Sequence, residues 1–211
     1  MTGRIRETTR AEAVVRARAM CGQLGVSIVY RLADESGGRD PFAADPASHW
    51  RTAIRRVAVA SCDCAGFVAW ALGYDRYQPG FLHPWEWINC DSAILDARGP
   101  AGWFTEVATP IAGDLVVFPS IDLDHDGSRD RVGHIGVIVA VSPRWVPGAL
   151  AELRVAHCSD GNMKRYGRAI AETTGIIWSG ADSFRGRRDP RWAATFLRYQ
   201  RFAAATPAAA A

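Results

Sequence analysis

The first half of the chain carries apolar positions at helical spacing. Residues 8–25 are typical of an amphipathic helix, in which Thr9 and Glu12 fit a capping box before the apolar run. A strongly apolar segment predicts a second helix over 64–72, and a short third helix is predicted over 91–97. This part of the chain is therefore expected to be mainly helical.

From about residue 112 onward, short β-branched runs replace the helical pattern. The segments GDLVVFP (113–119) and GHIGVIVAV (133–141), with a polar loop between them, predict an antiparallel hairpin. Other short apolar runs typical of strands are 26–30, 152–159, 175–179 and 195–202. Helices followed by strands favour an α+β fold with an antiparallel sheet.

Length and charge narrow the class of protein. The 211 residues suit one domain, which we expect to span residues 1–202, with an alanine-rich, disordered tail at 203–211. A formal net charge of +3, without a basic stripe interleaved with aromatics, argues against a nucleic-acid partner. No run approaches the roughly 18 apolar residues that a membrane span requires. The charged N-terminus lacks the apolar stretch of a secretory signal, so the sequence predicts a cytoplasmic protein.

The motif SCDCAGFVAWALG (61–73) contains the first candidate for chemistry. It places Cys64 at the predicted start of a helix, with Asp63 as the expected N-cap. Unpaired N–H groups and the positive end of the helix dipole stabilise a thiolate there, below the ordinary thiol pKa of about 8.5. Cys64 is therefore a candidate nucleophile, and the open alternative is a buried cysteine that acts as a small apolar residue.

A cysteine nucleophile needs a histidine within hydrogen-bond reach and a third group that orients this histidine. His134 opens one predicted strand, and His157 lies near the end of another. If these strands are neighbours, both side chains can point toward a helix packed on one face of the sheet. The spacing alone leaves open that both are hydrogen-bonded structural residues.

Cysteine and histidine also raise the alternative of a zinc site. The candidate ligands are Cys62, Cys64, His157 and Cys158. The C-x-C spacing is a poor match to the usual spacing of zinc ligands, and there is no second such pair in the sequence. A nucleophile is therefore favoured over a metal ligand at Cys64.

Several segments resemble the NlpC/P60 cysteine peptidases of the papain-like superfamily. In family order they are GVSIVY (25–30), DCAGFVAWALG (63–73), AGDLVVF (112–118), VGHIGVIV (132–139) and RVAHCS (154–159). The resemblance implies a papain-like α+β fold with N-terminal helices packed on a central antiparallel sheet. It implies Cys64 as nucleophile, His134 as general base and His157 as the group that orients the base. It also implies Tyr30 and Asp63 as residues of the substrate or oxyanion site.

The same resemblance implies a peptidase or amidase that hydrolyses amide bonds, most often in peptidoglycan stem peptides, with no cofactor needed for catalysis. The departures from the family concern the substrate pocket, because Ala65 replaces the usual serine and a long loop precedes Cys64. Two alternatives stay open: a deamidase or acyltransferase that uses the same triad on a protein or lipid, and a catalytically idle calcium-binding module. Peptidoglycan lies outside the cytoplasm. The sequence leaves open both delivery to the periplasm or cell wall by a phage lysis system or secretion apparatus and action on a target in the cytoplasm.

The loop of the predicted hairpin carries aspartates at the spacing of a calcium-binding loop. The candidate ligands are Asp122, Asp124, Asp126, Ser128 and Asp130. Gly133 stands where such a loop usually has a bidentate glutamate. The sequence leaves open both a structural calcium ion and a solvated acidic turn.

Overall fold

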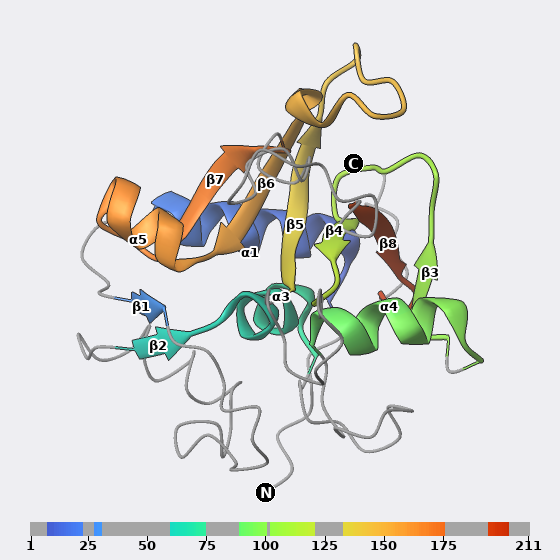
Figure 1. Cartoon of the computed structure of the whole chain (residues 1–211), viewed down its shortest axis with the longest axis horizontal. Coiled ribbons are helices and arrows are strands. Elements are labelled where there is room, and N and C mark those ends of the chain that lie inside the picture. Colours follow the sequence, from blue (N-terminus) through green and yellow to red (C-terminus); the bar gives the residue numbers. More distant parts are fainter. Residues whose placement is uncertain are drawn as a thin grey trace, which may run out of the picture.

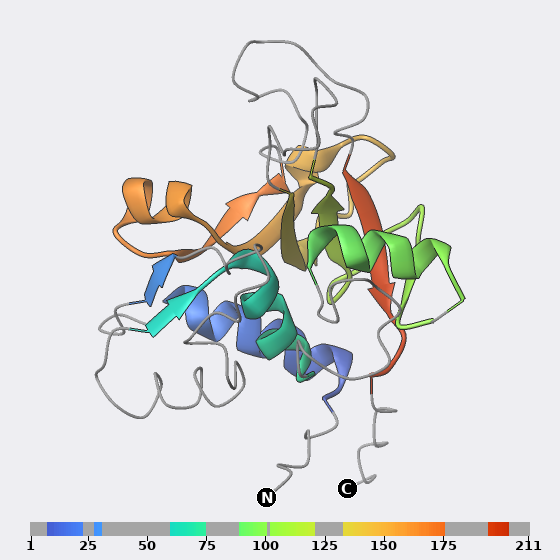
Figure 2. The same cartoon turned by 60° about the horizontal axis from the view of Figure 1, so that its bottom comes forward.

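The computed structural model describes residues 8–22, 28–30, 60–74, 89–100, 102–120, 133–175 and 194–202. These residues form an α+β fold in which helices pack against an antiparallel sheet, as predicted (Figure 1, Figure 2). The helices are α1 (Arg10–Gly22), α3 (Cys64–Leu72), α4 (Cys90–Arg98) and α5 (Asp160–Tyr166), with a short 3-10 turn at Leu150–Glu152.

A sheet with the strand order β3-β8-β4-β5-β6-β7 forms the centre of this fold, and its neighbouring strands run antiparallel. Its strands are β3 (Phe104–Glu106), β4 (Leu115–Phe118), β5 (His134–Val141), β6 (Leu153–Cys158), β7 (Ile170–Thr174) and β8 (Thr195–Tyr199). The predicted hairpin strands pair as β4 and β5, with Phe118 opposite His134. Two short strands, β1 (Ile28–Tyr30) and β2 (Ala60–Cys62), form a separate parallel pair.

The two faces of the sheet carry different apolar clusters. On one face, Val137 of β5 packs in a buried cluster with Ala17 of α1 and Phe67 of α3. On the other face, Ile138 of β5 packs with Val155 of β6. Figure 2 shows α1 and α3 together on one side of the sheet. Because α3 packs against β5 on this face, its N-terminus is held close to that strand.

The predicted start of α1 and the two predicted ends of α3 are confirmed. At the start of α1 the Thr9 N–H donates to Glu12 Oε2 at 2.9 Å, and the Glu12 N–H donates to Thr9 Oγ1 at 3.2 Å, which is a capping box. Asp63 caps α3 by accepting the Gly66 N–H at 2.7 Å. Gly73 ends α3 with a φ of 79°, a left-handed conformation that favours glycine.

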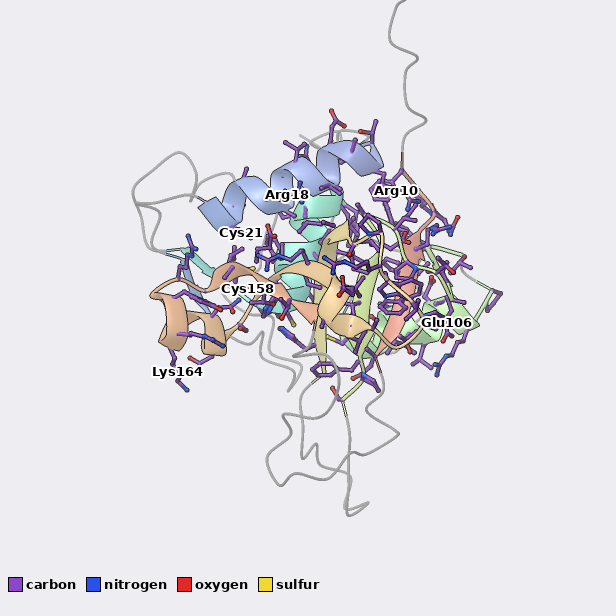
Figure 3. The ribbon with its side chains drawn as sticks, turned by 90° about the horizontal axis from the view of Figure 1, so that it is seen from above. Arg10, Arg18, Cys21, Glu106, Cys158 and Lys164 are labelled. Atoms are coloured by element: carbon purple, nitrogen blue, oxygen red, sulfur yellow. The ribbon has the colours of Figure 1, made fainter. Side chains whose placement is uncertain are left out.

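A buried carboxylate ties the N-terminal helix to the sheet. Asp114, which precedes β4, is fully buried and accepts hydrogen bonds from Arg10 at 2.7 Å and from Arg198 at 3.0 and 2.9 Å. It also accepts the Ile111 N–H at 2.9 Å. Gly113 has a φ of 92°, and a side chain there would collide with Arg10, which lies at the β8 end of α1 (Figure 3). These contacts explain the glycine and the aspartate before β4: Asp114 binds the two arginines, and Gly113 leaves room for Arg10.

Replacing Asp114 with asparagine is expected to lower the free energy of unfolding by about 3 kcal/mol, because one partner of a buried ion pair is lost. The exposed pair between Arg98 and Glu106, at 3.2 Å, supplies the matched control. Glu106→Gln should cost less than about 1 kcal/mol, as exposed ion pairs do. Urea unfolding of the three proteins measures both values, and equal losses would contradict the structural role of Asp114.

Several described elements were not predicted from the sequence: strands β2, β3 and β7, helix α5 and the 3-10 turn. Strands β2 and β3 and the 3-10 turn have three residues each, β7 is largely polar (IAETT), and α5 has seven residues. Segments this short or this polar carry no clear period. The strand predicted over 175–179 is wrong at its start, because β7 ends at Thr174 and Gly175 follows it in a turn; residues 176–179 lie outside the described residues.

Several predictions fall outside the described residues: the last residues of the first helix, the loop after Tyr30, the calcium loop and the tail at 203–211. The extent of the domain, at 1–202, and the cytoplasmic location stay predictions. Within the described ranges, no helix has the length and hydropathy that crossing a membrane requires.

Candidate active site

Cys64 is the first residue of α3, and its side chain is buried. Asp63 uses its carboxylate to cap the Gly66 N–H, and its carbonyl accepts the Phe67 N–H at 3.1 Å. The N–H groups of Cys64 and Ala65 lie in the first turn, where no carbonyl of the helix can accept them. Together with the helix dipole, these groups favour negative charge beside the Cys64 sulfur.

The pKa of Cys64 is lowered to about 5. The largest cause is a hydrogen bond with Cys90, whose Sγ lies 4.0 Å from the Cys64 Sγ. A hydrogen bond with His134 and the charge of that ring lower the pKa further, while burial and the Asp63 carboxylate act in the opposite direction. Since an ordinary thiol titrates at about 8.5, these contacts favour the thiolate form of Cys64 at neutral pH.

Three neighbouring strands place a line of polar side chains beside this thiolate. His134 opens β5, and its Nε2 lies 2.9 Å from Nδ1 of His157 on β6. The two rings stand at 85° to each other. Nε2 of His157 lies 3.0 Å from Oγ1 of Thr173 on β7. The structure therefore brings together the three residues of the predicted triad and adds Thr173 at its far end.

The direction of these hydrogen bonds depends on which ring nitrogens carry the protons. Burial and the charge of His134 hold the pKa of His157 well below its usual range, so His157 is neutral and has one ring proton. With this proton on Nε2, His157 donates to Thr173, and its Nδ1 accepts the Nε2–H of His134. The remaining nitrogen of His134, Nδ1, is then the one available to the Cys64 sulfur. Such a line keeps His134 in one orientation and one tautomer.

We expect Thr173→Val to lower kcat/KM about tenfold, since it leaves the buried Nε2–H of His157 without an acceptor, a cost near 1.4 kcal/mol. Thr173→Ser keeps an acceptor and should recover most of the loss. Kinetics on one substrate, with thermal unfolding as a check of folding, distinguish the two variants. Equal losses in valine and serine variants would show that the methyl group of Thr173, and not its hydroxyl, matters.

The histidines reach the thiolate differently from the predicted arrangement. Strand alternation places His134 and His157 on the face that carries Ile138 and Val155, whereas α3 packs on the opposite face. The contact forms because His134 is the first residue of β5, and α3 lies at the end where this strand begins (Figure 1). The Cys64 thiol therefore contacts His134 at the end of strand β5, and not across the face of the sheet.

The other predicted site residues have defined positions in the backbone. Tyr30 ends β1 and pairs with Cys62 in the parallel ladder, two residues before Cys64. Asp63 is buried and serves as the helix cap. Its carboxylate is engaged with the Gly66 N–H, a contact that supports the start of α3. A role of Tyr30 or Asp63 toward substrate stays a prediction.

The described residues support neither a zinc site nor a calcium site. No cluster of three or more histidine, cysteine or acidic side chains capable of holding a metal occurs among them. The zinc alternative on Cys62, Cys64, His157 and Cys158 is therefore not supported there. The aspartate-rich loop that holds the candidate calcium ligands lies outside the described residues.

Comparison with known families agrees with this geometry. Residues 55–149 match the model of the CHAP domain, a domain of the papain-like, NlpC/P60-related group of cysteine peptidases and amidases. The predicted relationship to papain-like cysteine peptidases is thus confirmed, and the α+β fold is consistent with it. The match includes Cys64, Cys90 and His134, whereas His157 and Thr173 lie beyond its end. No curated protein matches the chain.

Proposed function

From this relationship to papain-like peptidases and amidases, which indicates a hydrolase of peptidoglycan, we propose that the chain cleaves an amide bond of the stem peptide with Cys64 as nucleophile. His134 is the general base and acid, and His157 orients it. One observation carries the proposal: Cys64, whose pKa is lowered, is hydrogen-bonded to His134, and His134 is hydrogen-bonded to His157.

In the first half of the proposed reaction, the Cys64 thiolate attacks the carbonyl carbon of the amide, and the carbonyl electron pair moves onto oxygen. The first-turn N–H groups of α3 stabilise this oxyanion. The C–N bond then breaks, and protonated His134 gives its proton to the departing nitrogen. The products of this half are an amine and a thioester on Cys64.

In the second half, His134 takes a proton from water while the water oxygen attacks the thioester carbon. The C–S bond breaks, and Cys64 returns as a thiolate beside protonated His134. The carboxylic acid product loses its remaining proton to solvent and leaves as a carboxylate. His157 stays neutral throughout, since its role is to accept the Nε2–H of His134 and to hold the ring. The net reaction consumes one water for each amide bond.

The experiment that tests this function is mass spectrometry of peptidoglycan fragments after incubation with the protein. Cys64→Ala is the matched control, and parallel samples contain added calcium or a chelator. New stem-peptide fragments made by the parent protein alone would establish the hydrolase and identify the bond. A dependence of the rate on calcium would favour a structural calcium ion over a solvated acidic turn in the aspartate-rich loop.

Absence of fragments under both calcium conditions would overturn the cell-wall substrate. If Cys64 then still alkylates below neutral pH, the same centre acts on another amide or acyl group, as a deamidase or acyltransferase would. If Cys64 is also unreactive, the chain is a binding module that retains the fold. The two results separate a wrong substrate from a wrong mechanism.

A further inference from the structure

A second buried thiol lies against the proposed nucleophile. The sulfurs of Cys64 and Cys90 are 4.0 Å apart, and 5% and 6% of the two residues' surfaces are exposed. Each cysteine is the first residue of its helix, Cys64 after the Asp63 cap of α3 and Cys90 after the Asn89 cap of α4. Two helix N-termini therefore meet at one pair of sulfurs, and both dipoles favour negative charge there.

The fold fixes Cys90 in this position. Asn89 and Ser92 form a capping box at the start of α4, with N–H to side-chain oxygen distances of 2.9 and 2.7 Å. Gly133 lies against Cys90: a Cβ on Gly133 would be 2.8 Å from the Cβ of Cys90. Since Gly133 immediately precedes His134, the lack of a side chain lets Cys90 pack directly beside the start of β5. Cys90 thus lies between Cys64 and the residue that precedes His134.

The two sulfurs differ in charge. The hydrogen bond with Cys90 is the largest cause of the lowered pKa of Cys64. The same bond, followed by burial, raises the pKa of Cys90 well above its usual range. Since Cys64 also has the hydrogen bond with His134, Cys64 is assigned as the thiolate of the pair and Cys90 as the S–H donor. Reversibly oxidised cysteines are accessible, low-pKa thiols beside a resolving thiol; Cys64 has the low pKa and the neighbouring thiol, and 5% of its surface is exposed.

The remaining cysteines make other contacts. Cys62 Sγ donates to the Asp63 carbonyl at 2.9 Å, and Cys158 Sγ donates to the Cys62 carbonyl at 3.5 Å. Burial raises the pKa of Cys158, and burial raises that of Cys21 to about 12. Cys64 is thus a cysteine with a lowered pKa, and Cys90 is the thiol whose sulfur lies 4.0 Å from it.

We propose that Cys64 and Cys90 are a reversible redox pair, in which a peroxide oxidises Cys64, Cys90 closes a disulfide with it, and a dithiol reductant restores the nucleophile. In the first step the Cys64 thiolate attacks one peroxide oxygen and the O–O bond breaks. This gives Cys64 sulfenic acid and a hydroxide or alkoxide, which carries away the electron pair.

In the second step the sulfur of Cys90 attacks the sulfenic sulfur, the S–O bond breaks, and hydroxide leaves with the Cys90 proton as water. Two electrons have then passed from the sulfurs to the peroxide. The sulfurs must approach by about 2 Å to reach the S–S bond length of about 2.05 Å. A dithiol reverses the step by exchange and is itself oxidised to a disulfide. The pair would switch off Cys64 and protect it from irreversible oxidation.

The test treats the folded protein with hydrogen peroxide, blocks free thiols and maps tryptic peptides without reduction. Trypsin places Cys64 and Cys62 in peptide 57–76, Cys90 in 77–98 and Cys158 in 155–164. We expect 57–76 linked to 77–98, in both the parent protein and Cys62→Ala. Iodoacetamide labelling of Cys64 should fall at least about tenfold on oxidation and recover with dithiothreitol.

Cys90→Ser supplies the second measurement, compared with its own reduced sample. Its Cys64 should give a dimedone adduct of the sulfenic acid and, at higher peroxide, a sulfinic acid that dithiothreitol does not reverse. Linkage of 57–76 to 155–164 instead, or irreversible oxidation of Cys64 in the parent with Cys90 still free, would overturn the proposal. No step uses peptidoglycan, so this result is independent of the proposed substrate.

Discussion

Cys64→Ala is expected to lower kcat/KM for amide hydrolysis by at least about 10⁴-fold, because removal of a nucleophile leaves only the contribution of binding and oxyanion stabilisation. The loss should appear in kcat, since the thiolate forms a bond to substrate only during the chemical step. Fragment release from peptidoglycan over a series of substrate concentrations measures both constants. The unfolding midpoint should change little, as the substitution removes one buried atom.

Cys21→Ala is the matched control for this substitution. Cys21 is also buried and also lies in a helix, near the C-terminal end of α1 (Figure 3). It belongs to no contact of the proposed centre, so its removal should leave kcat/KM within about threefold of the parent, a change under 0.7 kcal/mol. Comparable losses in both variants would mean that buried thiols support folding here and that Cys64 has no separate chemical role.

His134→Ala is expected to have the second largest effect, a loss of about 10³-fold or more in kcat/KM, because it removes the proton acceptor and donor of both half-reactions. It also removes a hydrogen bond and a positive charge that lower the pKa of Cys64. The thiolate fraction at a given acidic pH should therefore fall, and the pH at which Cys64 alkylates should move upward. Cys90 still donates to Cys64, so the shift stops short of the ordinary thiol value.

Two readouts separate catalysis by His134 from a structural role. The kinetic loss and the alkylation shift should occur together while the urea midpoint stays near that of the parent. Added imidazole enters the space left by the ring and should recover part of the rate. A variant with lost activity, an unchanged alkylation profile and a lowered midpoint would contradict the role of His134 as the base.

The parts of the site predicted from sequence depend on strong local rules. The Asp63 cap and the Gly73 end bracket nine residues, so the position of Cys64 at a helix start followed from capping chemistry alone. His134 could be placed because it opens a long β-branched strand. The family resemblance, and not the spacing, joined these two residues to His157.

What the sequence missed depends on tertiary contacts. Thr173 lies in a largely polar strand that pairs with β6, and nothing local marks its hydroxyl as the acceptor for His157. Cys90 had a local signal, since Asn89 and Ser92 frame a helix start, but its distance from Cys64 depends on how α3 and α4 pack. The prediction that the helix packs on the same face of the sheet as His134 and His157 was likewise wrong, because strand alternation does not tell which face the helices cover.

The central claim is that Cys64 is an activated thiolate, and its alkylation rate as a function of pH tests that claim most directly. Iodoacetamide labelling of peptide 57–76, in a Cys62→Ala background, follows Cys64 alone. Because the thiolate is the reacting form, the rate should rise through a pKa of about 5 and be constant at neutral pH. A rate that instead rises through about 8.5, as for an ordinary thiol, would contradict the account.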